Sequence, residues 1–173
     1  VSINVSSGNV ISSDFMDIFL KVIDKYESVR HFLDFEIGAA DFYSSPNDME
    51  SMIHMLHDLG SSVSLDGLGG DTLLMSQLEI PPVDMVKFHR HFLLTGMKNV
   101  NNRILFEKMA EIFNACNIPV LCEGIETSKE AHFVQECGIS YMQGFYYGRP
   151  VPFDIFEKKY MIPQPAYLAF HAQ

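Results

Sequence analysis

Positively charged residues are scarce in this chain. Its 173 residues include 12 Lys and Arg against 22 Asp and Glu, which gives a formal net charge of −10. Such a field repels the phosphate backbone of nucleic acids and disfavours duplex binding. It does not exclude a small phosphorylated ligand, because a bound divalent cation can reverse the local sign of the potential.

Cysteine is also rare, and its three positions are Cys116, Cys122 and Cys137. The number is odd, and the sequence holds no CxxC pair and no His/Cys cluster at zinc spacing. Neither a disulfide framework nor a zinc site is therefore indicated. We interpret the three cysteines as buried small hydrophobes of a protein in a reducing cytosol.

Long apolar runs and a signal peptide are missing as well. No stretch is long and apolar enough to span a membrane, and Val1 opens directly into an apolar segment. We therefore expect a cytoplasmic chain that makes no membrane contact itself, although a parent protein could be membrane-tethered. A chain that begins inside a strand is also expected to belong to something longer.

What the sequence does contain is a series of six short apolar segments, each with a polar residue at or near its end. The segments are Val1–Ser6, His31–Ile37, Ser62–Asp66, Met85–His89, Pro119–Glu123 and Tyr141–Gly144, and the polar residues are Asn4, Glu36, Asp66, Lys87, Glu123 and Gln143. Parallel strands joined by helices form a barrel or a doubly wound sheet, with the chemistry at the carboxyl ends of the strands. The pattern predicts an α/β domain with a site at that end.

Helical patterns separate most of these segments. We expect helices at about 14–27, 46–59, 71–79, 101–117, 127–138 and 153–160, with Thr127 and Glu130 forming a capping box. A loop is expected around Gly96, and the helix at 101–117 is expected to bury one apolar face made of Ile104, Leu105, Met109, Ile112 and Phe113.

Six strands do not close an eight-stranded barrel, so two sheet edges should be open. We expect a homodimer, another protein partner or the tail Met161–Gln173 to cover these edges.

Five sequence motifs resemble those of a known protein family. The segment 122–127 (CEGIET) resembles the "AEGVET" strand of the EAL family, and 141–150 (YMQGFYYGRP) resembles its "YxQGYxxxRP". Upstream, 2–6 (SINVS) resembles "SVNLS", 33–37 (LDFEI) resembles "LELEIT", and 83–87 (VDMVK) resembles "VDxLK". The motifs occur in family order and at family spacing through nearly the whole chain.

EAL domains are bacterial cyclic-di-GMP phosphodiesterases with a TIM-like (β/α) barrel. The resemblance implies that residues 1–173 are the C-terminal two-thirds of a single EAL-type barrel domain, incomplete at about six parallel strands. The Glu-Ala-Leu strand of the signature is then expected before Val1.

The resemblance also implies a site in which two divalent metals, Mg or Mn, activate water beneath the scissile phosphate. The positions that match family metal ligands are Asn4, Glu36 and Asp66. The positions that match catalytic groups are Lys87 and Glu123. The positions expected to contact the ligand are Glu126, Gln143 and Arg149.

Several departures from the family pattern cluster around the second metal. The family's Asp pair reads Asp66-Gly67 here, His89 stands where the family has Asp, and Ala39 stands where it has a second Glu. The loop "DDFGTGYSSL" reads DGLGGDTLLM over 66–75. Losing carboxylates removes charge that a metal needs. The site is therefore expected to be vestigial, with weak metal binding or none.

Simpler interpretations stay open for the individual residues. Asn4 could bond neighbouring backbone, Glu36 and Asp66 could be solvated strand-end carboxylates, and Lys87 could form an ion pair with Glu123. For the whole chain we expect a degenerate EAL domain without catalysis, acting as a regulatory or protein-interaction module or as a cyclic-di-GMP receptor. The alternative is a metal-dependent cyclic-di-GMP phosphodiesterase, active once the missing N-terminal strands are present.

Overall fold

The computed structural model describes residues 1–6, 18–22, 25, 27–70 and 80–161. The helix expected at 71–79, half of the helix expected at 14–27 and nearly all of the tail Met161–Gln173 lie outside these residues. Within the first helix, residues 18–22 are helical as expected.

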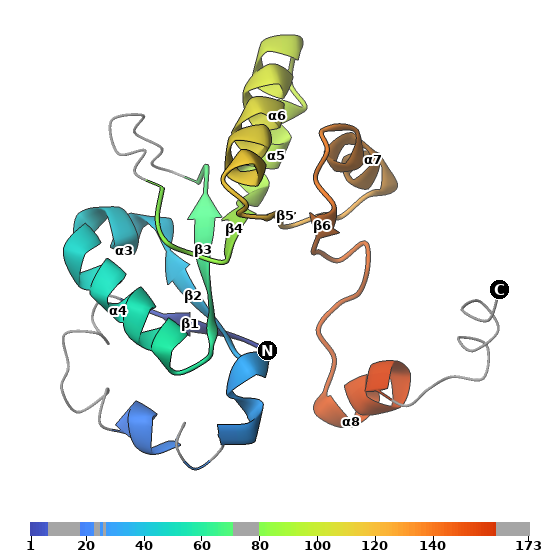
Figure 1. Cartoon of the computed structure of the whole chain (residues 1–173). Helices are drawn as coiled ribbons and strands as arrows, with labels where there is room; N and C mark the ends of the chain where they lie inside the picture. Colours follow the sequence, from blue (N-terminus) through green and yellow to red (C-terminus); the bar gives the residue numbers. More distant parts are fainter. Residues whose placement is uncertain (7–17, 23–24, 26, 71–79, 162–173) are drawn as a thin grey trace, which may run out of the picture.

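Six parallel strands form one sheet in the order β1-β2-β3-β4-β5-β6 (Figure 1). They are β1 (Ser2–Val5), β2 (Asp34–Gly38), β3 (Ser62–Leu68), β4 (Met85–Phe88), β5 (Val120–Cys122) and β6 (Tyr141–Met142). Strands that follow one another in the chain are neighbours in the sheet, as βαβ units require. The predicted incomplete barrel of six parallel strands is confirmed, with β1 and β6 at its edges.

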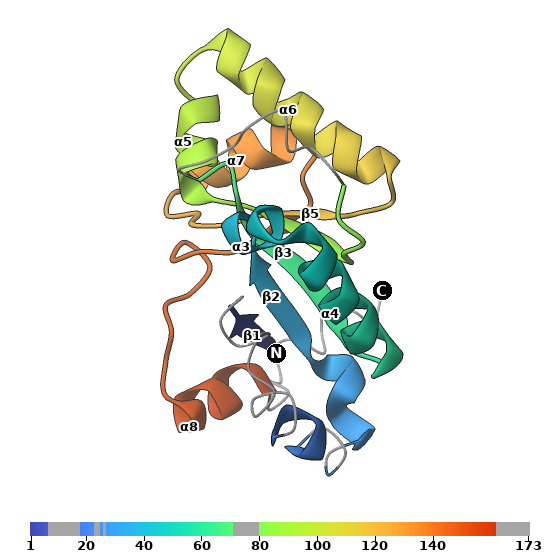
Figure 2. The same ribbon diagram turned by 90° about the vertical axis from the view of Figure 1, so that its left-hand side faces the viewer.

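The connecting elements are η1 (Glu27–Phe32), α3 (Ala39–Ser44), α4 (Pro46–Asp58), α5 (Arg90–Gly96), α6 (Val100–Ala115), α7 (Ser128–Glu136), α8 (Phe153–Phe156) and η3 (Glu157–Met161). Helices α3 and α4 lie over β2 and β3, whereas α5, α6 and α7 gather at the other end of the sheet (Figure 2). The chain that leaves β6 runs away from the sheet to α8 (Figure 1).

Three local predictions were wrong. His31 belongs to η1, so β2 begins only at Asp34. Helix α3 was not expected, because its N-cap residue is Gly38, which has no side chain that would signal a helix start. Helix α5 takes up the first part of the loop expected around Gly96, and only the turn at 97–99 remains. This helix was not expected because its cap is the ring of His89, an unusual N-cap residue that accepts from the His91 amide.

The face that α6 buries also differs from the prediction. Met109 and Phe113 are buried as expected, but Ile104, Leu105 and Ile112 are 50%, 44% and 49% exposed. Phe106 takes their place, since its ring contacts Phe88, Phe92 and Phe133. This aromatic cluster anchors β4, the strand that carries Lys87, to α5 and α6.

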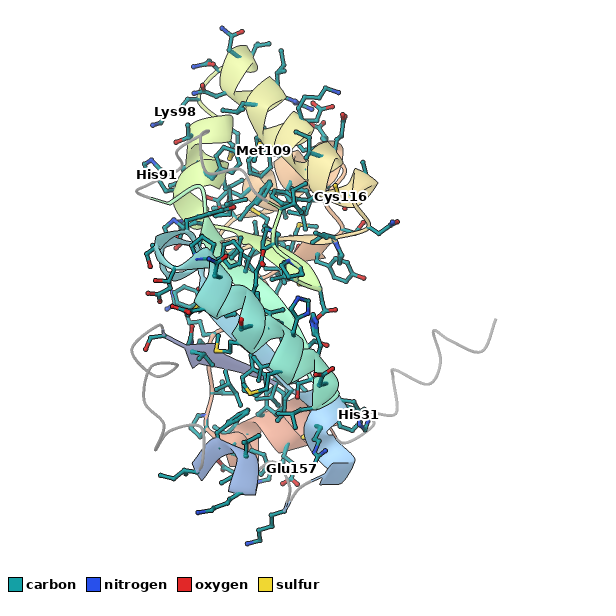
Figure 3. The ribbon with its side chains drawn as sticks, turned by 60° about the vertical axis from the view of Figure 1, so that its left-hand side comes forward. His31, His91, Lys98, Met109, Cys116 and Glu157 are labelled. Atoms are coloured by element: carbon teal, nitrogen blue, oxygen red, sulfur yellow. The ribbon has the colours of Figure 1, made fainter. Side chains whose placement is uncertain are left out.

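The cysteine prediction is correct for two residues of three. Cys122 and Cys137 are buried, and burial raises the pKa of the Cys122 thiol to about 12, which keeps it protonated. Cys116 is exposed at the C-terminal end of α6 (Figure 3), so it is not a core residue. Among the described residues, no helix is both long and apolar enough to cross a membrane.

Candidate functional site

Strand alternation gives the sheet one apolar and one polar face. Phe35, Ile37, Val63, Leu65, Val86 and Phe88 are buried on the face packed against the helices. The intervening residues of β1 to β4 face the other way and include Asn4, Glu36, Ser64, Asp66 and Lys87. Asn4 pairs with Glu36 in register, and Asp66 pairs with Gly38. The structure thus places the predicted metal ligands on one polar face.

Lys87 is the most deeply buried charged group of this face, with 2% of its surface exposed. Its ammonium contacts Glu36 Oε1 and lies 4.0 Å from Asp34 Oδ2. The ion pair that Lys87 makes is therefore with Glu36, and the alternative pairing with Glu123 is not the one formed.

Asp34 is a member of this face that the sequence analysis missed. Its carboxylate accepts hydrogen bonds from Ser64 Oγ at 2.7 Å and from Ser2 Oγ at 3.0 Å. These hydroxyls hold Asp34 on the same face of β2 as Glu36, two residues earlier, where its carboxylate faces the Lys87 ammonium. The period of two along β2 could have found it, because Asp34 precedes Glu36 by two positions.

Asp66 and Glu123 form the second pair of the face. Burial, then the negative charge of Asp66, raises the pKa of Glu123 to about 7, although Lys87 works in the opposite direction. Asp66 Oδ1 is buried and has no hydrogen-bond partner. An orphaned carboxylate oxygen beside a carboxyl with a raised pKa suits a shared proton or a bound cation.

The raised pKa of Glu123 predicts a pH-dependent stability. Between its ordinary value of 4.5 and about 7, the folded state holds a proton that the unfolded state releases. The contribution of this proton to the free energy of unfolding is complete below pH 4.5 and is lost as the pH rises to 7. Urea unfolding in a chelator should therefore show stability falling over this window, and Glu123→Gln should flatten the fall and exceed the native chain at pH 8. Glu111→Gln, at an exposed carboxylate of α6, should leave the slope unchanged, and an unchanged slope in Glu123→Gln would contradict the assignment.

The oxygen atoms on this face are of the type that binds a hard divalent cation. Asn4, Glu36 and Asp66 offer oxygen ligands, and the unpartnered Asp66 Oδ1 is the atom best placed to accept a metal. Within the described ranges, however, no three His, Cys, Asp or Glu side chains are grouped as a metal site would need. A cation would also compete with the Lys87 ammonium for Glu36.

The residues expected to contact a ligand fall into two places. Gln143 and Arg149 both line a cavity of about 560 Å³ beside β6, together with Phe145, Tyr147 and Tyr160. The guanidinium carbon of Arg149 lies 4.4 Å from the centre of the Phe145 ring. Backbone bonds to Cys122 and Ile125 fix the Gln143 peptide at the end of β6.

Glu126 does not line that cavity. Its carboxylate accepts a hydrogen bond of 3.0 Å from Arg90, a residue that the sequence analysis missed. Arg90 also donates to the Gly124 carbonyl and, at 3.1 Å, to Glu130. No local pattern could have found this contact, since the bonded partners lie 34 to 40 residues further along the chain.

The predicted capping box at the start of α7 is confirmed. Thr127 Oγ1 accepts from the Glu130 amide, and Glu130 accepts from the amides of Glu126 and Thr127. Burial alone would raise the pKa of Glu130, but the hydrogen bonds from the Glu126 backbone, Arg90 and the Thr127 backbone outweigh it and lower the pKa. Glu130 is therefore an ionised, buried anchor of the turn that follows Glu123.

Comparison with known proteins gives the family. The EAL domain family model matches residues 1–150. The chain is 30% identical over 154 residues to the biofilm architecture maintenance protein MbaA of Vibrio cholerae, covering 87% of this chain and 19% of that protein. It is 26% identical over 160 residues to the cyclic di-GMP phosphodiesterase PdeR of Escherichia coli, covering 92% of this chain and 24% of that protein.

Solved structures show the same fold. The EAL enzyme Bd1971 in its cGMP-bound form superposes with a TM-score of 0.80 at 22% identity, covering 93% of this chain and 42% of that one. The fold is that of EAL-type TIM-like barrels, and this chain belongs to the EAL domain family. It spans between 19% and 42% of the length of the curated relatives compared with it.

Proposed function

We propose that this chain is a cyclic-di-GMP-binding regulatory module of a signalling protein, with little or no hydrolytic activity. One observation carries the proposal: the Lys87 ammonium is bound to Glu36, one of the carboxylates expected to hold a metal. A metal at this position would have to displace a buried cation. Of the expected carboxylate ligands, only Asp66 keeps a buried oxygen without a hydrogen-bond partner, which is too little for a metal-dependent hydrolase.

Named relatives and neighbours support the choice of ligand. PdeR is a cyclic di-GMP phosphodiesterase, and neighbouring structures include PaMucR in complex with c-di-GMP and BlrP1 of Klebsiella pneumoniae with manganese and cyclic-di-GMP. We extend the ligand to this chain on the basis of its cavity. Arg149 supplies a cation for a phosphate, Gln143 supplies amide donors and acceptors, and the rings of Phe145 and Tyr147 supply faces on which a base can stack.

Metal, where bound, is proposed to be Mg or Mn held by Asn4, Glu36 and Asp66. A divalent ion there would neutralise phosphate charge and polarise a water molecule. The residues of this chain do the remaining work: Lys87 keeps positive charge at the base of the site, and Arg149 and Gln143 orient the dinucleotide. Gly67 supplies no side chain where the family pattern has a second carboxylate, which is our reason for proposing slow hydrolysis.

Calorimetric titration of cyclic-di-GMP into the 173-residue chain with Mg²⁺ tests the proposal. We expect a dissociation constant on the order of micromolar. Arg149→Gln should weaken binding by about tenfold or more, because it removes a charge-assisted contact to phosphate. Arg103→Gln is the matched control, since Arg103 also lies over a phenylalanine ring but pairs with Glu136 away from the cavity. No heat from a folded sample, or equal losses in both variants, would overturn the proposal.

The second candidate function is cyclic-di-GMP hydrolysis by the parent protein. The unpartnered Asp66 Oδ1 favours it, because that atom can accept a metal. Chromatography of the reaction mixture distinguishes the two functions: appearance of the linear dinucleotide with Mn²⁺ would establish the enzyme, and unchanged cyclic-di-GMP would support the receptor.

We also propose that a second copy of the chain or another protein covers the open sheet edges. In the described part of the sheet β1 and β6 are not paired with each other, and Ile3 and Tyr141 on these strands are 40% and 53% exposed. Exposed strand edges favour pairing with another chain. Sedimentation velocity should show a concentration-dependent species larger than the 19.6 kDa monomer, and a monomer at all concentrations would exclude self-association.

A further inference from the structure

Arg90 ties the end of β4 to the turn that follows β5. It lies three positions after Lys87, at the first residue of α5. Its guanidinium donates to the Gly124 carbonyl, to Glu126 Oε2 at 3.0 Å and to Glu130 Oε1 at 3.1 Å. All three acceptors follow Glu123 within seven residues, so one side chain holds this whole turn.

The aliphatic part of Arg90 is engaged as well. Gly124 has a φ of +70°, and a Cβ on it would lie 2.7 to 2.9 Å from the Cβ, Cγ and Cδ atoms of Arg90. The backbone of the turn therefore rests directly on the Arg90 stem. Packing and hydrogen bonding together give this contact a defined geometry rather than that of a mobile surface ion pair.

Glu130 connects Arg90 to the backbone of the turn. One oxygen of its carboxylate accepts from Arg90, and the other accepts from the amides of Glu126 and Thr127 at 2.6 and 2.9 Å. The Glu130 side chain is only 8% exposed, so losing Arg90 would leave a buried carboxylate with its charge less balanced. Arg90 thereby orients the group that caps α7.

We propose that Arg90 is a positioning residue that fixes Glu123 relative to Lys87 on the polar face. Pairing between β4 and β5 ends at Phe88 and Cys122. Beyond it, the Glu123 amide donates to the Phe88 carbonyl at 3.0 Å, and the Arg90 contacts continue the connection. Arg90 acts through the turn, and it is absent from the lining of the cavity that holds Gln143 and Arg149.

Hydrogen exchange of single amides tests this proposal without any ligand. In Arg90→Gln the amides of Glu123, Glu126 and Thr127 should exchange about tenfold faster, because their acceptors lose their fixed positions. The amides of Asp84 and Val86, which donate to Val63 and Pro119 away from the turn, should keep their rates and report that the fold is intact. Arg90→Lys should resemble Arg90→Gln, since one ammonium cannot serve the three acceptors that the guanidinium fork reaches. Native exchange at Glu123 in Arg90→Gln would overturn the proposal.

Ligand affinity provides the functional readout, and this arm rests on the proposed function. Where the native chain binds cyclic-di-GMP, Arg90→Gln should weaken binding by about 10–100-fold, as for residues that orient the groups of a site. Arg103→Gln, which also removes an arginine paired with a glutamate of α7, should bind normally. Native affinity in Arg90→Gln would mean that the contact stabilises the turn alone and would overturn the positioning role. A native chain that binds nothing refutes the proposed function, and the exchange rates then decide the role of Arg90.

Discussion

Replacing Lys87 by methionine should be the most damaging single change on the polar face. Lys87 is 2% exposed, its ammonium contacts Glu36 and lies 4.0 Å from Asp34, and its charge also acts on Glu123. Methionine keeps the volume of the side chain and removes the charge. We expect a loss of about 3–5 kcal/mol in the free energy of unfolding at pH 8, because partly buried carboxylates are left without their cation.

The same variant should partly recover in acid. Lowering the pH protonates carboxylates that no longer have a cation, and the difference from the native chain should shrink between pH 8 and pH 5. Urea unfolding at both values measures this. Lys108→Met is the control, because Lys108 is 59% exposed in its pair with Glu111 and its loss should cost little. Equal effects of the two substitutions would show that Lys87 is not the electrostatic centre of the face.

Local patterns in the sequence were enough to predict the parallel sheet and the polar residues near its strand ends, although not the polar face on which those residues lie. Period-two alternation in β2 and β3 separates Phe35 and Val63 from Glu36 and Ser64, and the structure keeps that separation. The capping box of α7 was also predictable, because Thr127 and Glu130 are three residues apart and satisfy each other's backbone. In both cases the determining interactions are short-range.

Pairing across the face was not predictable, because it depends on geometry between distant strands. Lys87 could have paired with Glu36 or with Glu123, and only the register of β2, β3 and β4 brings it to Glu36, 51 residues away. The Arg90 contacts were unpredictable for the same reason, because they also join residues that lie far apart in the sequence. Charge and spacing name the members of such a network, but the three-dimensional register decides which of them meet.

The face of α6 was mispredicted for a different reason. The helix carries apolar residues on more than one side, and hydrophobicity alone does not say which side packs inward. Contacts between aromatic rings determine which side of α6 is buried, since Phe106 and Phe113 both contact Phe88 of β4. Ile104 and Ile112 are left at the surface as a consequence.

Gly144→Ala should have the second large effect, at the junction of β6 with the turn after β5. A Cβ on Gly144 would lie 2.1 Å from the carbonyl oxygen and 2.3 Å from the nitrogen of Ile125. Ile125 is fully buried, and its backbone bonds to Gln143 and Tyr146 on either side of Gly144. The two backbones cannot separate without breaking these bonds, so we expect a loss of about 3 kcal/mol or more.

Gly138→Ala separates this clash from simple backbone strain. Gly138 has a φ of +78°, and a Cβ there would meet nothing within 4 Å. Its replacement should cost only about 1–2 kcal/mol, the penalty of a left-handed conformation for an L-residue. Urea unfolding of both variants gives the comparison, and equal losses would show that β6 can shift freely. A larger loss in Gly144→Ala, together with faster amide exchange at Gln143, would mean that the close approach of β6 to the Ile125 turn holds Gln143 in place at the cavity wall. The cavity beside β6 and the turn clamped by Arg90 would then be one mechanical unit, because Ile125 lies between Gly124 and Glu126 and bonds directly to Gln143.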